Sequence, residues 1–275
     1  MKVREALNDA AGKLVAVSVS ARLDAELLMA HALGVERDAL LLHHLDDPAP
    51  AAFDTLLDRR LAHEPVAYIT GRRAFWTIEL EVGPGVLVPR PDSETLIEAA
   101  LDHFRDRAPG SILDLGTGPG TLLLAALDQW PESTGLGIDA SESALVHARR
   151  NAERLDLADR AELRLGDWAE GLDRRFDLIL CNPPYVAAHS PLPVDVEAWE
   201  PAEALFAGAD GLDDYRRLAP QLPKLVERGG IACVEIGAGQ EESVSVLFAR
   251  EGFTISSRAD LQGVARCLVL ALDRE

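Results

Sequence analysis

Four consecutive residues, Asn182-Pro183-Pro184-Tyr185, directly follow the apolar run FDLILC, which predicts a buried strand. The two adjacent prolines remove two N–H donors and stiffen the loop, so its carbonyl oxygens point outward without a local partner. The side-chain oxygen of Asn182 can accept a hydrogen bond, and the ring of Tyr185 offers a face for stacking. The tetrapeptide therefore suits the binding of a planar NH2 group, and an ordinary loop is the alternative interpretation.

A glycine-rich turn, DLGTGPG at residues 114–120, follows a second apolar run. Gly116, Gly118 and Gly120 permit a sharp turn and a close approach of the backbone to a ligand, and the next helix offers free N–H groups. The dinucleotide fingerprint would need glycine at position 121, where Thr121 stands, so a nicotinamide or flavin enzyme is disfavoured. We expect a different ligand here, and a tight turn without a ligand is the alternative.

Acidic residues end the next two predicted strands. Asp139 can accept hydrogen bonds from both hydroxyls of a ribose that lies across the strand ends. Asp167 and Trp168 would border an adenine, with a carboxylate for its amino group and an indole for its ring face, or else form a helix cap beside a half-buried tryptophan. Together with the glycine turn, these residues predict an adenosine-containing cofactor.

The elements that must position these loops alternate between strands and helices from residue 111 onward. This alternation predicts a mostly parallel sheet with helices on both faces. Strands are expected at 111–116, 133–139, 161–167 and 176–182, followed by a helix around 212–228, the strand GGIACVEIG, a helix at 240–251 and the strands FTISSR and ARCLVLAL.

The first 64 residues have a different, helical pattern. Leu23, Leu27 and Ala30 are expected on the buried face of a second helix, and Phe53, Leu56, Leu57 and Leu61 on that of the last. A β-rich stretch follows Pro65, and its turn signal at 82–86 predicts a hairpin linker.

Asp92-Ser93-Glu94 predicts the start of the next helix. We therefore expect a helical domain at 1–73, a hairpin linker at 74–90 and a second domain at 91–275.

The composition is that of an acidic globular protein. The chain has 275 residues, 48% of them hydrophobic, and its 46 acidic and 27 basic side chains give a formal charge of −19. Most of the acidic excess lies in residues 86–275, which disfavours tight binding to bare nucleic acid or to an anionic membrane surface. The charged start of the chain and the lack of a long apolar run predict a cytoplasmic protein.

Cysteine and histidine give no sign of a metal site. Cys181, Cys233 and Cys267 lack CxxC spacing and each lies in an apolar run, so we expect buried reduced thiols. The seven histidines show no ligand spacing, and we assign no metal.

The motifs DLGTGPG, Asp139 and NPPY, in this order, resemble those of class I S-adenosylmethionine-dependent methyltransferases that act on amino nitrogen. Longer segments resemble the PrmC/HemK family of release factor glutamine methyltransferases, namely EPVAYITGRRAFW, VLVPRPDSETLIE, DVEAWEPAEALFAGADGLDDYRRL and VEIGAGQ. The resemblance covers essentially the whole chain. Family members commonly carry PRPETE where this chain has PRPDSE at 89–94, and position 119 is often not proline, but neither change removes a ligand-facing side chain.

This resemblance implies a class I methyltransferase α/β fold, with a mostly parallel seven-stranded sheet, a small N-terminal helical domain and a β-hairpin linker. It implies that the helical domain at 1–73 helps to dock the substrate and that the domain at 91–275 is the cofactor-binding catalytic domain. It implies S-adenosyl-L-methionine as cofactor, S-adenosyl-L-homocysteine as product and a peptide-chain release factor as the protein partner. The methyl group would go to the side-chain nitrogen (N5) of the glutamine in a Gly-Gly-Gln loop. We expect a monomer that contacts neither nucleic acid nor membrane directly.

Carried over residue by residue, the family's pattern gives each motif a role. The cofactor-binding positions, with Asp167 added from its place beside the adenine, are Gly116, Thr117, Gly118, Pro119, Gly120, Asp139, Asp167, Trp168 and Asn182. The glutamine amide would be bound by Asn182, Pro183, Pro184 and Tyr185, with Asn182, Pro183 and Tyr185 as the catalytic residues. Acceptance of the two N–H bonds by Asn182 and the Pro183 carbonyl would aim the nitrogen at the methyl group, and no general base is identified.

Two other functions compete with this interpretation. In a DNA adenine-N6 methyltransferase the same tetrapeptide binds the planar NH2 group of the substrate adenine. Such an enzyme needs a surface that binds phosphate groups, and the acidic excess after residue 86 argues against one. A non-enzymatic adaptor with the same fold would be expected to lose the glycine turn or the tetrapeptide. Both motifs are intact in this chain.

Overall fold

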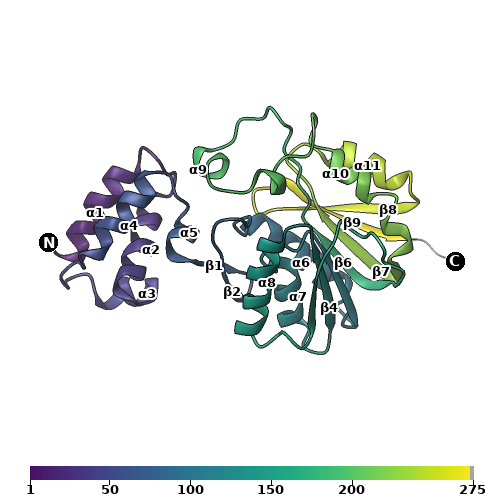
Figure 1. The fold of residues 1–275 in the computed structure, drawn as a ribbon, viewed down its shortest axis with the longest axis horizontal. Coiled ribbons are helices and arrows are strands. Elements are labelled where there is room, and N and C mark those ends of the chain that lie inside the picture. Colours follow the sequence, from purple (N-terminus) through teal and green to yellow (C-terminus); the bar gives the residue numbers. More distant parts are fainter. Residues whose placement is uncertain (273–275) are drawn as a thin grey trace. The chain divides into compact units, whose positions relative to one another are not determined.

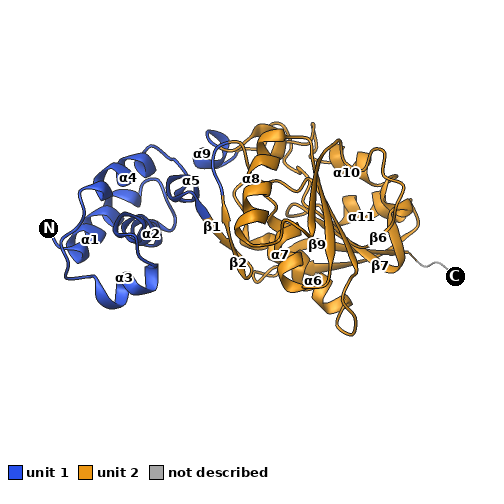
Figure 2. Cartoon of the chain, turned by 60° about the horizontal axis from the view of Figure 1, so that its bottom comes forward, with its two compact units in different colours: residues 1–72, 82–84, 192–199 blue, residues 73–81, 85–191, 200–275 orange. Residues whose placement is uncertain are grey.

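The structure is a computed structural model that describes residues 1–272. The chain forms two compact units (Figure 2). Unit 1 contains residues 1–72, 82–84 and 192–199, and unit 2 contains residues 73–81, 85–191 and 200–275. The residues expected as a linker, 74–90, are divided between them, and a segment from late in the sequence packs with the N-terminal unit.

Unit 1 is a small helical unit, as predicted (Figure 1). Its core is apolar, and α1 contributes Val3, Leu7 and Leu14 to it from one face. Gly34 ends the second helix in the left-handed conformation that glycine adopts without strain. The helices are α1 (Val3–Leu14), α2 (Ala21–Leu33), α3 (Arg37–His43), α4 (Ala52–Leu61) and α5 (Val66–Thr70).

The predicted buried face of α2 is only partly correct. Ala30 is buried and Leu27 is half-buried, but Leu23 is exposed, and the helix also buries Ala25, Leu28 and Met29. The face is rotated because α2 also buries Asp24, whose carboxylate accepts a hydrogen bond from the buried Arg60 guanidinium at 2.8 Å. A buried ion pair between distant residues overrides the local leucine spacing.

Unit 2 contains the predicted seven-stranded sheet, with the order β5-β4-β3-β6-β7-β9-β8. The five strands from β5 to β7 are parallel, and β9 pairs antiparallel with both β7 and β8. The central strands β3 and β6 are almost wholly buried, as expected for a sheet covered on both faces. The strands are β3 (Ser111–Leu115), β4 (Thr134–Asp139), β5 (Ala161–Leu165), β6 (Phe176–Cys181), β7 (Val226–Glu235), β8 (Phe253–Ala259) and β9 (Ala265–Leu272).

Helices cover both faces of this sheet, with α6 and α7 on one side and α10 and α11 on the other (Figure 1). The helix expected at 212–228 is shorter than predicted, because Pro223 and the start of β7 at Val226 interrupt the apolar run. The helices are α6 (Glu94–His103), α7 (Thr121–Gln129), α8 (Glu142–Arg154), α10 (Asp213–Leu218) and α11 (Glu241–Ala249), with α9 (Val194–Glu197) in unit 1.

A hairpin does precede the catalytic sheet, but its turn is not at 82–86. Strands β1 (Arg72–Phe75) and β2 (Ile78–Glu81) are joined by Trp76 and Thr77. Trp76 adopts a positive φ of 55°, which its backbone N–H stabilises by donating to the Glu94 carboxylate at 2.9 Å. A side chain distant in sequence thus selects a turn that lacks the usual glycine.

Asn151 connects this hairpin to the glycine-rich turn. The side chain is fully buried on α8, and its oxygen accepts the Glu81 N–H at 2.6 Å. Its amide nitrogen donates to the Glu81 carbonyl at 3.0 Å and to the Pro119 carbonyl at 2.9 Å. One asparagine therefore satisfies three backbone groups from two segments.

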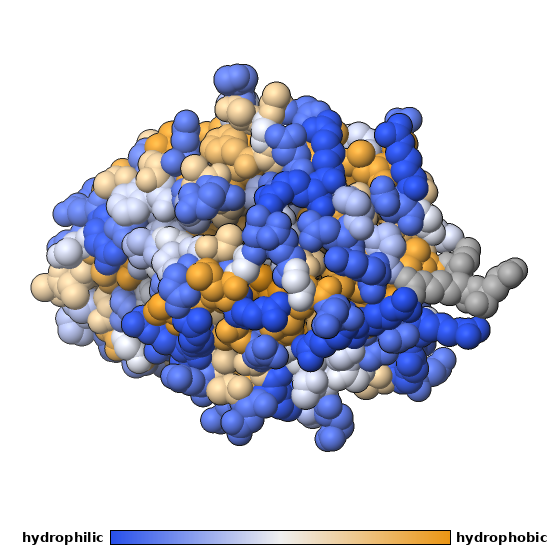
Figure 3. All heavy atoms as spheres, turned by 45° about the vertical axis from the view of Figure 1, so that its right-hand side comes forward, coloured by the Kyte–Doolittle hydropathy of each residue, from blue (hydrophilic) through white to orange (hydrophobic). Residues whose placement is uncertain are grey.

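The surface of the protein carries most of its charge. On the face drawn in Figure 3, hydrophilic residues predominate and hydrophobic residues lie scattered among them. All three cysteines are buried and free, as predicted. Within residues 1–272, no helix is both long enough and apolar enough to cross a membrane.

Candidate active site

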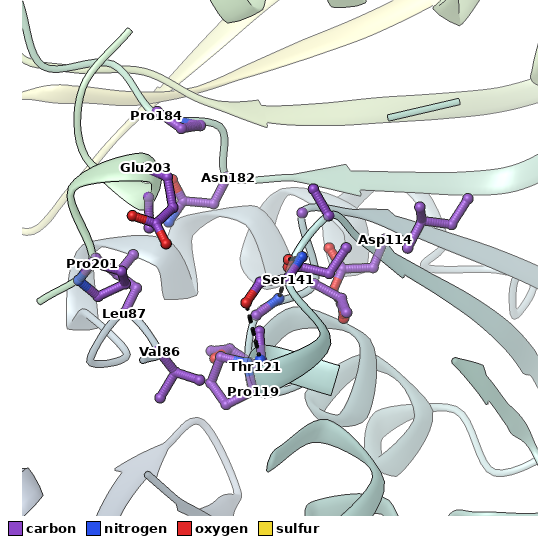
Figure 4. Close-up of a pocket in the computed structure, with 18 of the residues that line it drawn as sticks. Val86, Leu87, Asp114, Pro119, Thr121, Ser141, Asn182, Pro184, Pro201 and Glu203 are labelled. Carbon is purple, nitrogen blue, oxygen red and sulfur yellow. Dashed lines mark hydrogen bonds between the residues drawn. The ribbon is translucent and has the colours of Figure 1, made fainter. Parts of the chain in front are cut away.

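The sequence-predicted loops come together around one cavity of about 380 Å³ in unit 2. The cavity lies at the carboxyl ends of β3, β4, β5 and β6, where the sheet order reverses between β3 and β6. Ligands of open α/β sheets bind at such a reversal. In Figure 4, Asn182 and Glu203 border one end of the cavity, and Pro119 and Thr121 border the other.

The three glycines of the glycine-rich turn have different structural roles. Gly116, Gly118 and Gly120 all have positive φ values, which a side chain would disfavour. A Cβ on Gly116 would lie 3.3 Å from the Trp168 ring, and one on Gly120 would lie 2.7 Å from Leu124. Gly116 and Gly118 line the cavity, whereas Gly120 allows close packing at the start of α7.

Asp114 is a cavity residue that the sequence analysis included in the glycine-rich motif without assigning it a role. Its side chain is buried, and Oδ2 accepts the Thr117 hydroxyl at 2.7 Å and the Leu123 N–H at 3.1 Å. Oδ1 has no hydrogen-bond partner among the described residues. Burial raises the pKa of Asp114 to about 7, and a cation in the cavity would favour the ionised form of this carboxyl group.

Asp139 lies in the cavity as predicted, but it also holds the backbone around it. Its Oδ2 accepts the Gly118 N–H at 2.7 Å, and its Oδ1 accepts the Ser141 N–H at 2.8 Å. Burial raises the pKa of this carboxyl group. Each carboxylate oxygen keeps a second lone pair, so the group can still accept from a ligand hydroxyl.

Asp167 and Trp168 both line the cavity and are held from α10. The Asp167 carboxylate pairs with Arg217 at 2.5 Å, and both side chains are about half exposed. The Trp168 indole lies close enough to Asp214 to favour the charged form of this carboxylate, and its ring packs over Gly116. Trp168 also has a positive φ of 49°, an uncommon conformation for a bulky residue and one that is found at functional sites.

The NPPY loop presents only half of its residues to the cavity. Asn182 and Pro184 line it, whereas Pro183 and Tyr185 are absent from the lining given by the described residues, as is Gly120. The Asn182 side-chain nitrogen donates to the Ser93 hydroxyl at 3.2 Å. The remaining amide oxygen of Asn182 is therefore the group available to a ligand.

The opposite wall consists of the segment that leads into α6. The buried Glu200 carboxylate accepts the Val88 N–H at 3.0 Å and pairs with Arg90 at 2.5 Å. These contacts bring Val86 and Leu87 to the cavity, next to Pro201 (Figure 4). No local sequence pattern marks this wall as part of the site, because its contacts join residues more than a hundred positions apart.

Ser93 was expected only at a helix start, yet its hydroxyl makes no capping bond and instead faces Asn182. The cavity thus combines an unpaired buried carboxylate oxygen, a carboxylate suited to a ribose, an indole and an amide oxygen. A nucleoside that carries a cationic side chain fits this set of groups.

Comparisons with known proteins show the family to which this chain is related. Residues 5–71 match the model of the PrmC N-terminal domain, and residues 92–200 match that of the methyltransferase small domain. The release factor glutamine methyltransferase of Caulobacter vibrioides is 43% identical over 84% of this chain and 82% of its own length. That of Cereibacter sphaeroides is 41% identical over 96% of both chains.

Among solved structures, a methyltransferase from Pyrococcus furiosus shares the fold. Its TM-score is 0.51 at 17% identity, and the match covers 79% of this chain and 98% of that one.

Proposed function

The chain belongs to the family of release factor glutamine methyltransferases, and we propose that the cavity at Asn182 carries out the methyl transfer of this family. The protein is an S-adenosyl-L-methionine-dependent enzyme that methylates a glutamine side chain of a release factor. The finer proposal concerns the glutamine of a Gly-Gly-Gln loop and the residues that bind it.

The cofactor fits the groups that line the cavity. When bound, S-adenosyl-L-methionine supplies an electrophilic methyl group on a positively charged sulfur. Asp139 would accept from its ribose, and the unpaired Oδ1 of Asp114 would balance its ammonium group. Gly116 and Gly118 leave room for the close approach of the backbone, and Trp168 and Asp167 would border the adenine.

The observation that supports the proposal most is the orientation of Asn182. Its nitrogen is engaged by Ser93, so its oxygen is the free acceptor in the cavity, at the strand end next to the glycine turn. A glutamine amide nitrogen is a poor nucleophile because its lone pair is shared with its carbonyl. Acceptance of its N–H by the Asn182 oxygen localises electron density on the nitrogen and fixes its direction.

Orientation accounts for most of the expected rate enhancement. Holding two reactants in line can contribute about 7–11 kcal/mol through entropy that has already been lost on binding and through avoided solvent reorganisation. Pro183 and Tyr185 lie behind the surface of the cavity, so we assign both side chains to the support of the NPPY loop. The second acceptor for the glutamine NH2 group would then be a backbone carbonyl of this loop.

The remaining parts of the proposal concern partners and location. We assign substrate docking to unit 1, because its family model is separate from that of the methyltransferase domain. The acidic excess of residues 86–275 supports a protein substrate over a nucleic acid. We further propose a cytoplasmic monomer that has no direct contact with nucleic acid or membrane.

Transfer of a labelled methyl group tests this proposal. The enzyme and labelled S-adenosyl-L-methionine are incubated with a release factor, with the same factor carrying alanine in place of the loop glutamine, and with duplex DNA. Only the unchanged release factor should be labelled. Label on the alanine variant would contradict the assigned target, and label on DNA would favour the adenine methyltransferase.

A further inference from the structure

A buried carboxyl group lies behind the NPPY loop, outside the cavity. Glu235 ends β7, and only 1% of its surface is exposed. Its Oε1 accepts the Tyr185 hydroxyl at 3.3 Å, while Oε2 has no partner with full hydrogen-bond geometry among the described residues. The Ser93 hydroxyl is close enough to stabilise the charged form of this carboxyl group.

Glu235 therefore binds the residue at one end of the tetrapeptide and lies near the residue that holds the other end. At one end Ser93 holds the Asn182 side chain, and at the other end Tyr185 is the last residue of the motif. The Tyr185 carbonyl is also held by the Gln240 side chain, which donates to it at 3.0 Å. The loop is thus fixed at three points; Glu235 accepts directly at one of them, through the Tyr185 hydroxyl, and lies near Ser93, which makes another.

The hydrogen-bonding capacity of each group determines which partner donates in these contacts. A serine hydroxyl has one proton to donate, and an ionised carboxylate can only accept. When Ser93 donates its proton to Glu235, its oxygen can only accept from Asn182. Asn182 must then turn its NH2 group toward Ser93 and its oxygen toward the substrate.

We propose that Glu235, acting through Ser93, is a positioning residue that sets the amide orientation of Asn182 and so makes its oxygen the acceptor for the glutamine NH2. This inference rests on the proposed role of Asn182 in the methyl transfer. It assigns a function in the reaction to a side chain that does not touch the substrate.

Protonation of Glu235 would remove this control. A neutral carboxyl group can donate to Ser93, which frees the serine proton for the Asn182 oxygen and allows the amide to flip. Burial raises the pKa of Glu235 to about 7, although the contacts with Ser93 and Tyr185 act in the opposite direction. Activity should therefore be present above this pKa and fall as the pH drops through it.

Other groups surround Glu235, and none of them replaces its role. Asp92 and Arg266 form an ion pair at 3.0 Å, so their effects on Glu235 largely offset each other. The Tyr215 hydroxyl donates to the backbone carbonyl of Glu235 at 2.9 Å rather than to its carboxyl group. The pKa values of the neighbouring groups Tyr185, Tyr215, Cys181 and Cys267 are all raised, so these groups stay neutral near pH 7.

Glu235→Gln tests the inference, because glutamine keeps the shape of the side chain but can donate as well as accept. We expect kcat at saturating cofactor to fall about tenfold to hundredfold at pH 8, the scale of a misplaced reacting group. The dissociation constant for S-adenosyl-L-methionine should stay within about twofold of wild type. The decrease of kcat as the pH falls through about 7 should disappear in this variant. A purely structural defect would lower kcat without removing this pH dependence.

Two further variants sharpen the result. Glu242→Gln changes an exposed carboxylate on α11 and should leave both kcat and its pH profile unchanged. Ser93→Ala breaks the link between Glu235 and Asn182, so the loss in the double variant should be clearly smaller than the product of the two separate losses. Wild-type kcat with an intact acidic limb in Glu235→Gln, or losses that multiply in the double variant, would overturn the inference.

A measurement without turnover separates this inference from the proposed function. The side-chain NH2 resonances of Asn182 should titrate near pH 7 in the wild type and remain constant in Glu235→Gln. A wild-type enzyme that labels no release factor would contradict the proposed function even if this titration is seen. Asn182 resonances that do not respond to pH in the wild type would contradict the positioning role alone.

Discussion

Replacement of Asp114 by asparagine should stabilise the ligand-free protein while it impairs cofactor binding. Burial raises the pKa of Asp114 from 3.8 to about 7 in the folded chain. The folded state therefore holds a proton that the unfolded state releases between these two values, and stability falls as the pH rises through that range. Asparagine keeps the shape and the acceptor oxygen but does not ionise.

The magnitude follows from the shift. Each pKa unit corresponds to about 1.4 kcal/mol, so ionisation of Asp114 costs the ligand-free fold about 4 kcal/mol above pH 7. At pH 5 less than half of this cost is present, because the pH is then only about one unit above the pKa of Asp114 in the unfolded chain. The advantage of Asp114→Asn should therefore grow by about 3 kcal/mol between pH 5 and pH 8.

Urea unfolding at the two pH values provides the assay. Three of the four tryptophans, Trp76, Trp130 and Trp168, lie in unit 2 with Asp114, so most of the tryptophan residues report on that unit. The comparison between the two pH values cancels any cost of the substitution that does not depend on pH. Calorimetry at pH 8 should show at least about tenfold weaker binding of S-adenosyl-L-methionine, because a hydrogen bond to a charged group is worth about 1.5–3 kcal/mol.

A difference in unfolding free energy that is the same at pH 5 and pH 8 would refute the assignment of a strongly raised pKa. Unchanged cofactor affinity would refute the assignment of Asp114 to the ammonium group. The two results are independent, so one assignment can fail without the other.

The other site residues give two shorter predictions. Asp139→Ala should weaken S-adenosyl-L-methionine binding about tenfold or more, since it removes the ribose acceptor and frees the Gly118 and Ser141 N–H groups, and an unchanged calorimetric dissociation constant would rule out the ribose role. Asn151→Leu leaves the backbone N–H and carbonyl of Glu81 and the Pro119 carbonyl without partners, so the free energy of unfolding should drop by about 1–3 kcal/mol or more. The control Asn8→Leu, at an exposed position, should change this free energy by less than about 0.5 kcal/mol.

The features that could be predicted from the sequence are local ones. The glycine turn and the NPPY loop each follow an apolar strand directly, so spacing alone places them at strand ends. A parallel sheet brings those ends to one edge, which is why Gly116, Asp139 and Asn182 were expected together and are found around one cavity. The seven-stranded sheet came from the family resemblance and is confirmed.

The features that could not be predicted depend on contacts between distant residues. The buried pair of Asp24 and Arg60 rotates α2 away from its leucine pattern. Glu94 selects the hairpin turn at Trp76, and no local signal marks that contact. Ser93 has the sequence pattern of a capping residue, but its hydroxyl faces Asn182, and this role becomes visible only when β6 and the start of α6 are placed together.

The most direct test of the central claim compares wild type with Asn182→Ala. Both enzymes are incubated with a release factor and S-adenosyl-L-methionine, the glutamine-containing peptide is analysed by mass spectrometry, and cofactor affinity is measured in parallel by calorimetry. We predict a methyl group on the glutamine side-chain nitrogen with wild type, and a rate at least about a hundredfold lower with the variant, whose cofactor binding is reduced but measurable. Methylation of the same glutamine by Asn182→Ala at the wild-type rate would contradict the account.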